Sequence, residues 1–375
     1  METQLENGSV ESALDLDQEV EDVDESDDAA RSVEPVSYFG TEFDVHGLVR
    51  RFNSKAIVVP TFDPSGDLPD KRAQGFQRRG VWRPAQKQRF IESLLLGFPV
   101  PGIFLVEQPG KKYLVLDGQQ RLNALVDFYA GKFKLDADKV DDRFADATYE
   151  SLTEDLARSL DDTFIQSIII RTPSSLNEYE SVYQIFERLN SGGTNLQPHE
   201  IRVAIYGGTT VEAIRTLNED KNWRNIFGSR HARLKDQELI LRVIAMYVDS
   251  SYYKAPLKTF LNDFLYNHRN AGGLDLNALS ALFVSAAKII AENFGERPLR
   301  LGYQINAAIL ESVFVGVMQR IDAGGSATIA GASWKSAYDA LLKNQDYLAV
   351  VSKATANEEP VKQRLLLAGK EFAVL

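Results

Sequence analysis

Residues 113–121, Tyr-Leu-Val-Leu-Asp-Gly-Gln-Gln-Arg, have the residue types and order of an anion-binding turn. Residues 114–116 read as a short buried strand, and the apolar residues from Leu122 to Phe128 repeat at the spacing of one helix face. Gly118 permits a sharp turn between them, and the free N–H groups of a helix's first turn favour a phosphate or a carboxylate. Arg121 adds a planar fork of donors that suits phosphate oxygens. The stretch therefore predicts an anion site where a strand passes into a helix.

Asp117 has two interpretations. At the carboxyl end of the strand it could hold Mg²⁺, orient a water molecule or bond a ribose hydroxyl. It could equally be the N-cap of the helix, which is one of the commonest positions for aspartate. The residues of this stretch alone leave both roles open.

The sequence around the junction is basic and predicts two further elements. The apolar pattern predicts a helix over Gln86–Leu96 and a second strand over Ile103–Val106, and Gln108–Lys111 reads as a turn back toward Asp117. The cations before and within this helix are Lys71, Arg72, Arg78, Arg79, Arg83, Lys87 and Arg89. A solvated basic face is the usual explanation of such a run, but its place beside a candidate anion site favours attraction of phosphates.

A second candidate position lies at the end of an amphipathic helix predicted over Ser175–Asn190. Ser191–Thr194, Ser-Gly-Gly-Thr, end this helix with residues that tolerate left-handed backbone angles, and another helix starts at Pro198. Asn190 would then stand beside a glycine loop, where it could contact a ligand, and an ordinary glycine C-cap is the alternative. His199 is expected as a surface helix residue and not as a metal ligand.

In their order, these motifs resemble the DUF262 family, the amino-terminal, nucleotide-hydrolysing domain of GmrSD-type modification-dependent restriction enzymes. The resemblance covers residues 40–215 and rests on Gln77-Arg78, Val81-Trp82, Ile91-Glu92-Ser93, Pro99-Val100-Pro101, Asp117-Gly118-Gln119-Gln120-Arg121 and Phe186-Glu187-Arg188-Leu189-Asn190-Ser191-Gly192-Gly193-Thr194. The ordered set is specific, whereas each motif alone is weak. The family is in turn similar to the ParB and sulfiredoxin fold, in which a Gly-x-x-Arg turn at a helix N-terminus holds nucleotide phosphates. Gly118 and Arg121 match that turn.

The resemblance implies a nucleoside triphosphate pocket that works with Mg²⁺. Its catalytic residues would be Asp117, Gln119, Gln120 and Arg121, with Asp117 also the metal ligand. The nucleotide would be bound by Gln77, Arg78, Trp82, Glu92, Gly118, Arg121, Arg188 and Asn190. The resemblance also implies bacterial restriction or phage defence, in which NTP hydrolysis is coupled to the sensing of modified or foreign DNA.

Composition excludes several kinds of site. The 375 residues include no cysteine, so there is no disulfide framework, no thiol nucleophile and no cysteine-based zinc site. No two of the four histidines stand at metal-binding intervals; they are His46, His199, His231 and His268. We find no apolar run long enough to span a bilayer and no signal-peptide pattern, so a cytoplasmic location without membrane contact is expected.

The net charge of −11 comes from one end of the chain. Residues 1–35 contain 13 acidic residues and one basic residue, Arg31, which leaves +1 for the rest. Such a segment, with few large apolar residues, is expected to be disordered, and a solubilising role is favoured over shielding of the basic lead-in or docking of a partner. The body is not basic enough for its overall charge to indicate nucleic-acid binding.

These patterns predict an α/β (α+β) chain in three parts. Residues 1–36 form an acidic disordered tail, residues 37–208 a ParB/sulfiredoxin-like nucleotide-binding domain with a small mixed sheet, and residues 209–375 an all-helical domain. In the last part, helices are predicted over Thr210–Asn222, Lys235–Val248, Pro256–Phe264, Leu276–Phe294, Tyr303–Ile321 and Ser333–Asn344. A packing or partner-binding role is the default for such a bundle.

Two-domain relatives carry a nuclease module based on His and Asn after the nucleotide domain. The last histidine here is His268, and nothing beyond it supplies a histidine base beside metal-holding side chains. We therefore expect an NTPase that is not itself a nuclease, with any DNA cleavage performed by a separate nuclease or effector protein. Two alternatives remain: a DNA-binding module without hydrolysis, and a regulatory or antitoxin-like partner of a separate effector. Base preference and oligomeric state are not indicated.

Overall fold

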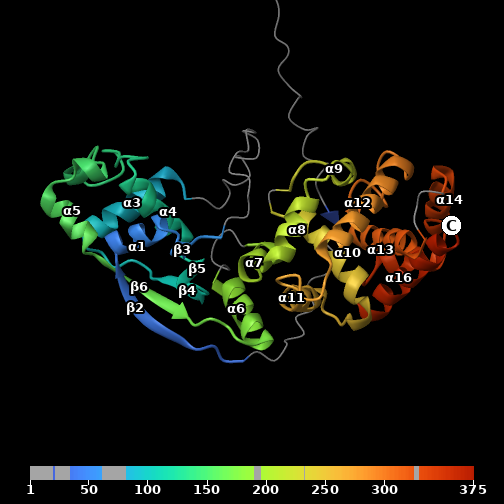
Figure 1. The fold of residues 1–375 in the computed structure, drawn as a ribbon. Helices are drawn as coiled ribbons and strands as arrows, with labels where there is room; N and C mark the ends of the chain where they lie inside the picture. Colours follow the sequence, from blue (N-terminus) through green and yellow to red (C-terminus); the bar gives the residue numbers. More distant parts are fainter. Residues whose placement is uncertain (1–19, 22–33, 61–81, 190–195, 232, 325–328) are drawn as a thin grey trace, which may run out of the picture. The chain divides into compact units, whose positions relative to one another are not determined.

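The computed structural model describes residues 20–21, 34–60, 82–189, 196–231, 233–324 and 329–375 (Figure 1). The chain divides into two compact units. One is residues 32–205, and the other is residues 206–375 together with the N-terminal stretch up to Arg31. Of the acidic segment predicted over residues 1–36, only Val20–Glu21 and residues 34–36 are among those described.

The unit of residues 32–205 is built on a five-stranded mixed sheet, in the order β2-β6-β4-β5-β3. These strands are β2 Tyr38–Asp44, β6 Phe164–Ile170, β4 Ile103–Gln108, β5 Lys112–Asp117 and β3 Ile57–Val58. Pairing is antiparallel between β2 and β6 and between β4 and β5, and parallel between β4 and β6 and between β3 and β5. The mixed sheet and the two predicted strands at residues 103–106 and 114–116 are confirmed.

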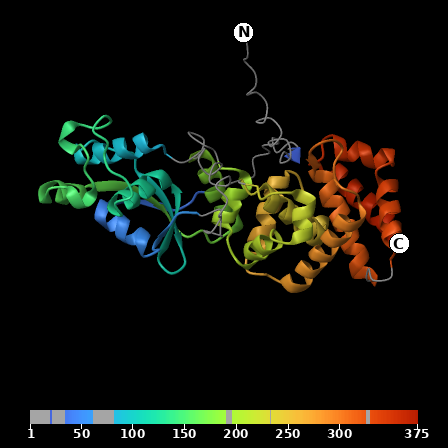
Figure 2. The ribbon, with the colours of Figure 1, turned by 90° about the horizontal axis from the view of Figure 1, so that it is seen from above.

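Four helices of this unit gather on one face of the sheet (Figure 1) and are seen from above in Figure 2. They are α1 Val45–Asn53, α3 Pro84–Leu95, α4 Gln119–Tyr129 and α5 Glu154–Asp161. Helix α6, Leu176–Leu189, contacts β5, and α7, Pro198–Ile205, packs on α6. Because helices flank β5, its three central residues Leu114–Leu116 are all buried, which explains why this strand reads as a continuous apolar run.

His199, in α7, is buried and does not lie on the surface as predicted. The reason is that nearly all of this short helix is enclosed, including Glu200, Arg202 and the apolar Ile201 and Val203. The polar residue types at positions 199, 200 and 202 suggested an exposed helix, but these side chains are buried.

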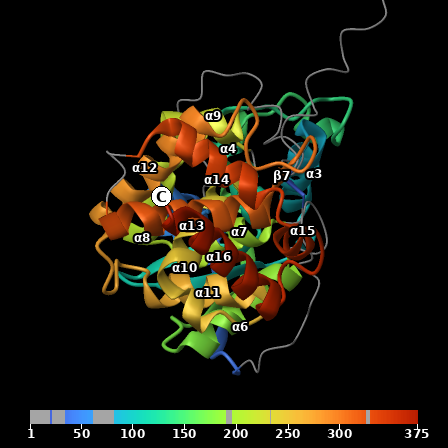
Figure 3. The same ribbon diagram turned by 90° about the vertical axis from the view of Figure 1, so that its right-hand side faces the viewer.

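Residues 206–375 are largely helical. The helices are α8 Thr209–Leu217, α9 Lys221–Phe227, α10 Lys235–Asp249, α11 Leu257–Asn267, α12 Leu276–Asn293, α13 Ala307–Gly324, α14 Gly331–Leu341, α15 Gln345–Ser352 and α16 Glu358–Ala373. Helix α13 is buried along residues 307–318 and packs on α10, α12 and α16; Figures 1 and 3 show α13 and α16 side by side. None of the helices described is both long and apolar enough to cross a bilayer.

Two features of this unit differ from the prediction. The helix predicted over Thr210–Asn222 is interrupted between α8 and α9, because Asp220 caps a new helix and its Oδ1 accepts hydrogen bonds from the N–H groups of Asn222 (2.9 Å) and Trp223 (3.0 Å). The unit is also not entirely helical, since the short strand β7, Ile305–Asn306, pairs in parallel with β1, Val20–Glu21.

A buried ion pair joins two central helices of this unit. Arg364 of α16 donates from Nε to Oε1 of Glu311 of α13 at 2.9 Å, and the two side chains are 2% and 1% exposed. The other carboxylate oxygen, Glu311 Oε2, is buried and has no hydrogen-bond partner among the described residues. The carboxylate thus depends on a single arginine.

Replacing Arg364→Met should destabilise the helical unit by about 3–5 kcal/mol, because it leaves the Glu311 charge buried and unpaired. The double variant Arg364→Met/Glu311→Leu should regain most of that loss. Urea unfolding followed by tryptophan fluorescence measures this, since buried Trp223 and Trp334 both lie in this unit. The control is Lys362→Met on the same helix: Lys362 and Glu358 form an exposed pair, so the loss should stay below about 1 kcal/mol.

Candidate functional site

The junction between β5 and α4 is built on one glycine. Strand β5 ends at Asp117, Gly118 has φ 98° and ψ 9°, and α4 begins at Gln119. A side chain is disfavoured in this left-handed region, and a Cβ added to Gly118 would lie 2.5 Å from Ile103 Cγ2 and 3.3 Å from Arg121 Nη2. The turn therefore requires glycine for both its backbone angles and its closeness to β4.

Gly118 is also the N-cap of α4, so the simple N-cap role considered for Asp117 is wrong. The first bond of the helix runs from Leu122 N to Gly118 O at 3.0 Å, and no side chain caps this end. The N–H groups of the first turn are left without acceptors inside the helix, as at any helix start. An anion placed here would meet unsatisfied donors and the positive end of the helix dipole.

Arg121 lies against this turn and is held by two acceptors. Its Nη2 donates to the backbone carbonyl of Gly102 at 2.8 Å and to Asp117 Oδ2 at 2.7 Å. The Arg121 side chain is 14% exposed and that of Asp117 is 37% exposed. Arg121 Nε is buried with no hydrogen-bond partner in the described part of the chain. The structure thus brings the predicted phosphate ligand and the predicted metal ligand into one ion pair.

A β-bulge sets the position of Asp117 at the end of its strand. Phe104 pairs with Asp117 and Leu105 pairs with Val115, so Leu116 is the extra residue between them. Bulges bend a strand and redirect the side chains that follow, and they are frequent beside functional sites. Here the bulge comes immediately before Asp117 and the turn at Gly118.

The predicted residues Trp82 and Gln120 also meet at the start of α4. The backbone N–H of Trp82 donates to Gln120 Oε1 at 3.1 Å, and the Trp82 ring packs edge-on against Phe90 at 5.3 Å between centroids. Gln120 therefore anchors the segment that leads into α3. The neighbouring Gln119 makes no side-chain hydrogen bond within the described residues, which leaves its amide for a ligand.

Other predicted residues have separate roles or fall outside the description. Glu92 of α3 accepts a hydrogen bond from the backbone N–H of Asp141 at 2.7 Å, so it fixes a loop. Arg188 is exposed in the last turn of α6 and donates from Nη2 to Gln184 at 3.2 Å. Gln77, Arg78 and Asn190 lie outside the described residues, as does the Ser191–Thr194 loop.

Gly102 is the site component that sequence reasoning missed. Its carbonyl positions Arg121, and a Cβ at Gly102 would lie 2.6 Å from the backbone oxygen of Gln166 in the neighbouring strand β6. The signal available in the sequence was its place directly after the Pro99-Val100-Pro101 motif and before an apolar strand. That position marks a close approach of two backbones.

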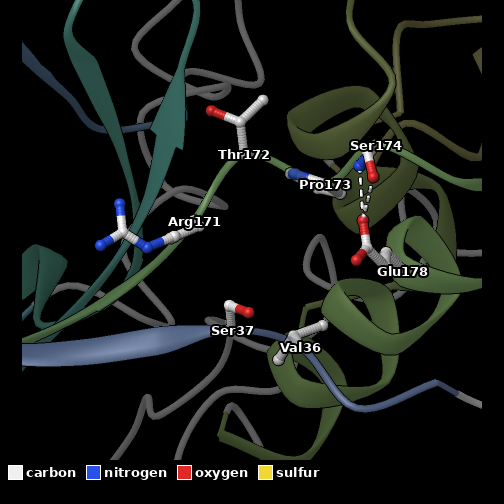
Figure 4. Close-up of a pocket in the computed structure, with 7 residues that line it drawn as sticks. All are labelled: Val36, Ser37, Arg171, Thr172, Pro173, Ser174 and Glu178. Carbon is white, nitrogen blue, oxygen red and sulfur yellow. Dashed lines mark hydrogen bonds between the residues drawn. The ribbon is translucent and has the colours of Figure 1, made fainter.

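Two hollows of this unit lie away from the junction. One, about 160 Å³, is lined by Val36, Ser37, Arg171, Thr172, Pro173, Ser174 and Glu178 (Figure 4). Glu178 there accepts hydrogen bonds from Ser174 N (2.6 Å) and Ser174 Oγ (2.8 Å), which lower the pKa of its carboxyl. Its carboxylate is thus held at the start of α6 by the residues that precede this helix. The other, about 520 Å³, lies between α1 and the far end of α4, at Tyr129 and Ala130.

The described residues contain no cluster of three or more acidic or histidine side chains that could hold a metal ion. A site with one carboxylate still fits Mg²⁺, because this ion usually keeps several waters and binds through one or two carboxylates plus the phosphates of its ligand. Asp117 is the residue at the junction with that chemistry.

Residues 66–207 match the family model described as GmrSD restriction endonuclease, N-terminal domain. This part of the chain is therefore similar to the GmrSD N-terminal domain. The match takes in α3, β4, β5 and α4, and therefore the whole junction at Asp117–Arg121. It associates the chain with restriction and defence systems. No curated protein matches the chain.

Replacing Gly118→Ala should destabilise the junction more than Gly110→Ala does. Both glycines have positive φ, +98° and +79°, but only Gly118 has an atom within 4 Å of the added Cβ. We expect a loss of about 1–2 kcal/mol at Gly110 from the backbone angle alone, and about 2–4 kcal/mol at Gly118, where the contact with Ile103 adds to it. Hydrogen exchange of the β5 amides measures both, and equal losses would contradict the close packing described.

Proposed function

We propose that the chain binds and hydrolyses nucleoside triphosphates with Mg²⁺ at the junction of β5 and α4. The observation that carries this is the combination at one turn of an uncapped helix N-terminus, a guanidinium and a carboxylate, at Gly118, Arg121 and Asp117. The helix N-terminus and the guanidinium of Arg121 supply donors for phosphate oxygens. The carboxylate of Asp117 supplies the protein ligand that a Mg²⁺ ion bound to phosphates usually has.

Each of these residues has a distinct part in the proposed reaction. The N–H groups after Gly118 and the Arg121 guanidinium bind the phosphates and stabilise the charge that develops on transfer. Asp117 holds the metal or orients the attacking water. Bound Mg²⁺ would neutralise charge on the phosphate oxygens. Gln119 has an unengaged amide and is the better candidate to orient the water or the γ-phosphate, whereas Gln120 already binds the backbone of Trp82.

The family match supports a setting for this activity. Its description names a restriction endonuclease, and we propose that the chain is the nucleotide-dependent component of a bacterial restriction or anti-phage system. Cleavage of DNA would then belong to a separate nuclease or effector protein. Arg78 and Asn190, which lie outside the described residues, stay predicted nucleotide ligands on the family resemblance alone.

Phosphate release from ATP, GTP, CTP and UTP, measured with and without Mg²⁺, tests the proposal. The wild type should release phosphate from at least one of them in a Mg²⁺-dependent way. Asp117→Ala and Arg121→Ala should each lower the rate about 100-fold or more, because each removes a group that acts on the transferred phosphate.

The matched control is Glu154→Ala and Arg158→Ala. These residues form an ion pair with the same four-residue spacing, on the exposed surface of α5 in the same unit (2.6 Å). Their loss should leave the rate within about two-fold of the wild type. Absence of both nucleotide binding and phosphate release in the wild type would refute the proposal, and salt-sensitive binding of duplex DNA without nucleotide would favour the DNA-binding alternative.

A further inference from the structure

The two charged groups that the proposed function needs are in direct contact with each other. Arg121 Nη2 lies 2.7 Å from Asp117 Oδ2, and the same nitrogen also donates to the Gly102 carbonyl. The bond to Gly102 holds the guanidinium at the turn, and the bond to Asp117 neutralises it. A phosphate that approaches Nη2 of Arg121 must compete with a carboxylate already in contact, and the charge of that carboxylate offsets the attraction of the guanidinium as a whole.

The same pair limits the binding of a metal ion on its own. Within the described residues, Asp117 belongs to no acidic or histidine cluster of metal-binding size, and its carboxylate is engaged by a cation. Mg²⁺ gives up its waters reluctantly and is held weakly by a single carboxylate. A free metal ion therefore gains little here, and it must also displace Arg121.

A metal-complexed triphosphate meets neither obstacle, because it brings both charges together. When Asp117 turns to the cation, Arg121 is released to the phosphates, and each charged group exchanges one partner of opposite sign for another. The partial exposure of Asp117, 37%, allows such an exchange without burying an unpaired charge. The Gly102 carbonyl keeps Arg121 at the turn during it.

We propose that the Asp117–Arg121 ion pair is a specificity element that makes the site select metal-complexed over metal-free triphosphates. This inference rests on the proposed function and adds the form of its substrate. It requires that metal and triphosphate increase each other's affinity by the same factor, since the two bindings are thermodynamically linked. It also gives Asp117 a role in the free protein, where it keeps Arg121 from binding anions that carry no metal.

Isothermal titration of each of the four nucleoside triphosphates, with Mg²⁺ and with EDTA, tests this on the full chain. The wild type should bind the Mg²⁺ complex much more tightly than the free nucleotide. Asp117→Asn keeps the shape but removes the charge, so Arg121 is released, and affinity for the metal-free nucleotide should rise about ten-fold. The preference for the Mg²⁺ complex should shrink. Asp117→Ser serves as a second variant if the first folds poorly.

A double-mutant cycle separates this role from simple removal of a negative charge near an anion. If Asp117 acts by holding Arg121, the gain from Asp117→Asn should vanish in an Arg121→Gln background. If repulsion of the nucleotide is the whole effect, the same gain persists there, and the inference is overturned. Glu154→Gln on α5 removes one charge from a similar pair and should leave metal-free affinity unchanged.

The outcomes also distinguish this inference from the proposed function. A wild type that binds no nucleotide even with Mg²⁺ refutes the function itself. A wild type that binds the Mg²⁺ complex, and whose Asp117→Asn variant gains no metal-free affinity, keeps the function and refutes the role of the ion pair.

Discussion

The left-handed conformation of Gly118 is the constraint on which the rest of the site depends. It ends β5 and starts α4 within one residue, and it does so while pressed against Ile103 of β4. Because α4 then begins at a fixed angle, Arg121 lies one turn later, where it reaches back to the Gly102 carbonyl at the start of β4. Two strands and a helix are thus tied together by groups that also belong to the candidate anion site, so the same few atoms would serve both stability and binding.

The contacts that position Arg121 also reduce its ability to attract an anion. An arginine held by two acceptors is well positioned but not free, and a carboxylate beside it lowers its attraction for phosphate. The uncharged carbonyl of Gly102 positions Arg121 and can remain bound to it. The charge of Arg121 is neutralised by Asp117, whose side chain is more exposed than that of Arg121. The division lets the guanidinium stay ordered while its charge becomes available.

The sequence predicted the elements whose residue pattern lies within one short segment, and it did not predict contacts between segments far apart in the chain. The strands at residues 103–106 and 114–116 and the helix of Leu122–Phe128 follow from apolar periodicity, and the turn follows from Gly118. Strand β2 has exposed residues and a central glycine, so its pattern is weak, and it is held in place by pairing with β6 over a hundred residues away. The contact between Asp117 and Arg121 was also missed, because residue types indicate what each group can bind but not that they bind each other.

A comparison of two carboxylate–guanidinium pairs among the described residues shows why exposure matters more than distance for such a role. Asp117–Arg121 in one unit and Glu311–Arg364 in the other both join carboxylate and guanidinium in direct contact. The second pair is enclosed, so neither charge can find another partner without unfolding its surroundings, and it serves packing. In the first pair the carboxylate is 37% exposed, so Asp117 can contact a further group from solvent without unfolding its surroundings. The pair at Glu311–Arg364 is therefore structural, whereas the more exposed pair at Asp117–Arg121 stands at a helix N-terminus, where an anion would meet N–H groups without helical acceptors.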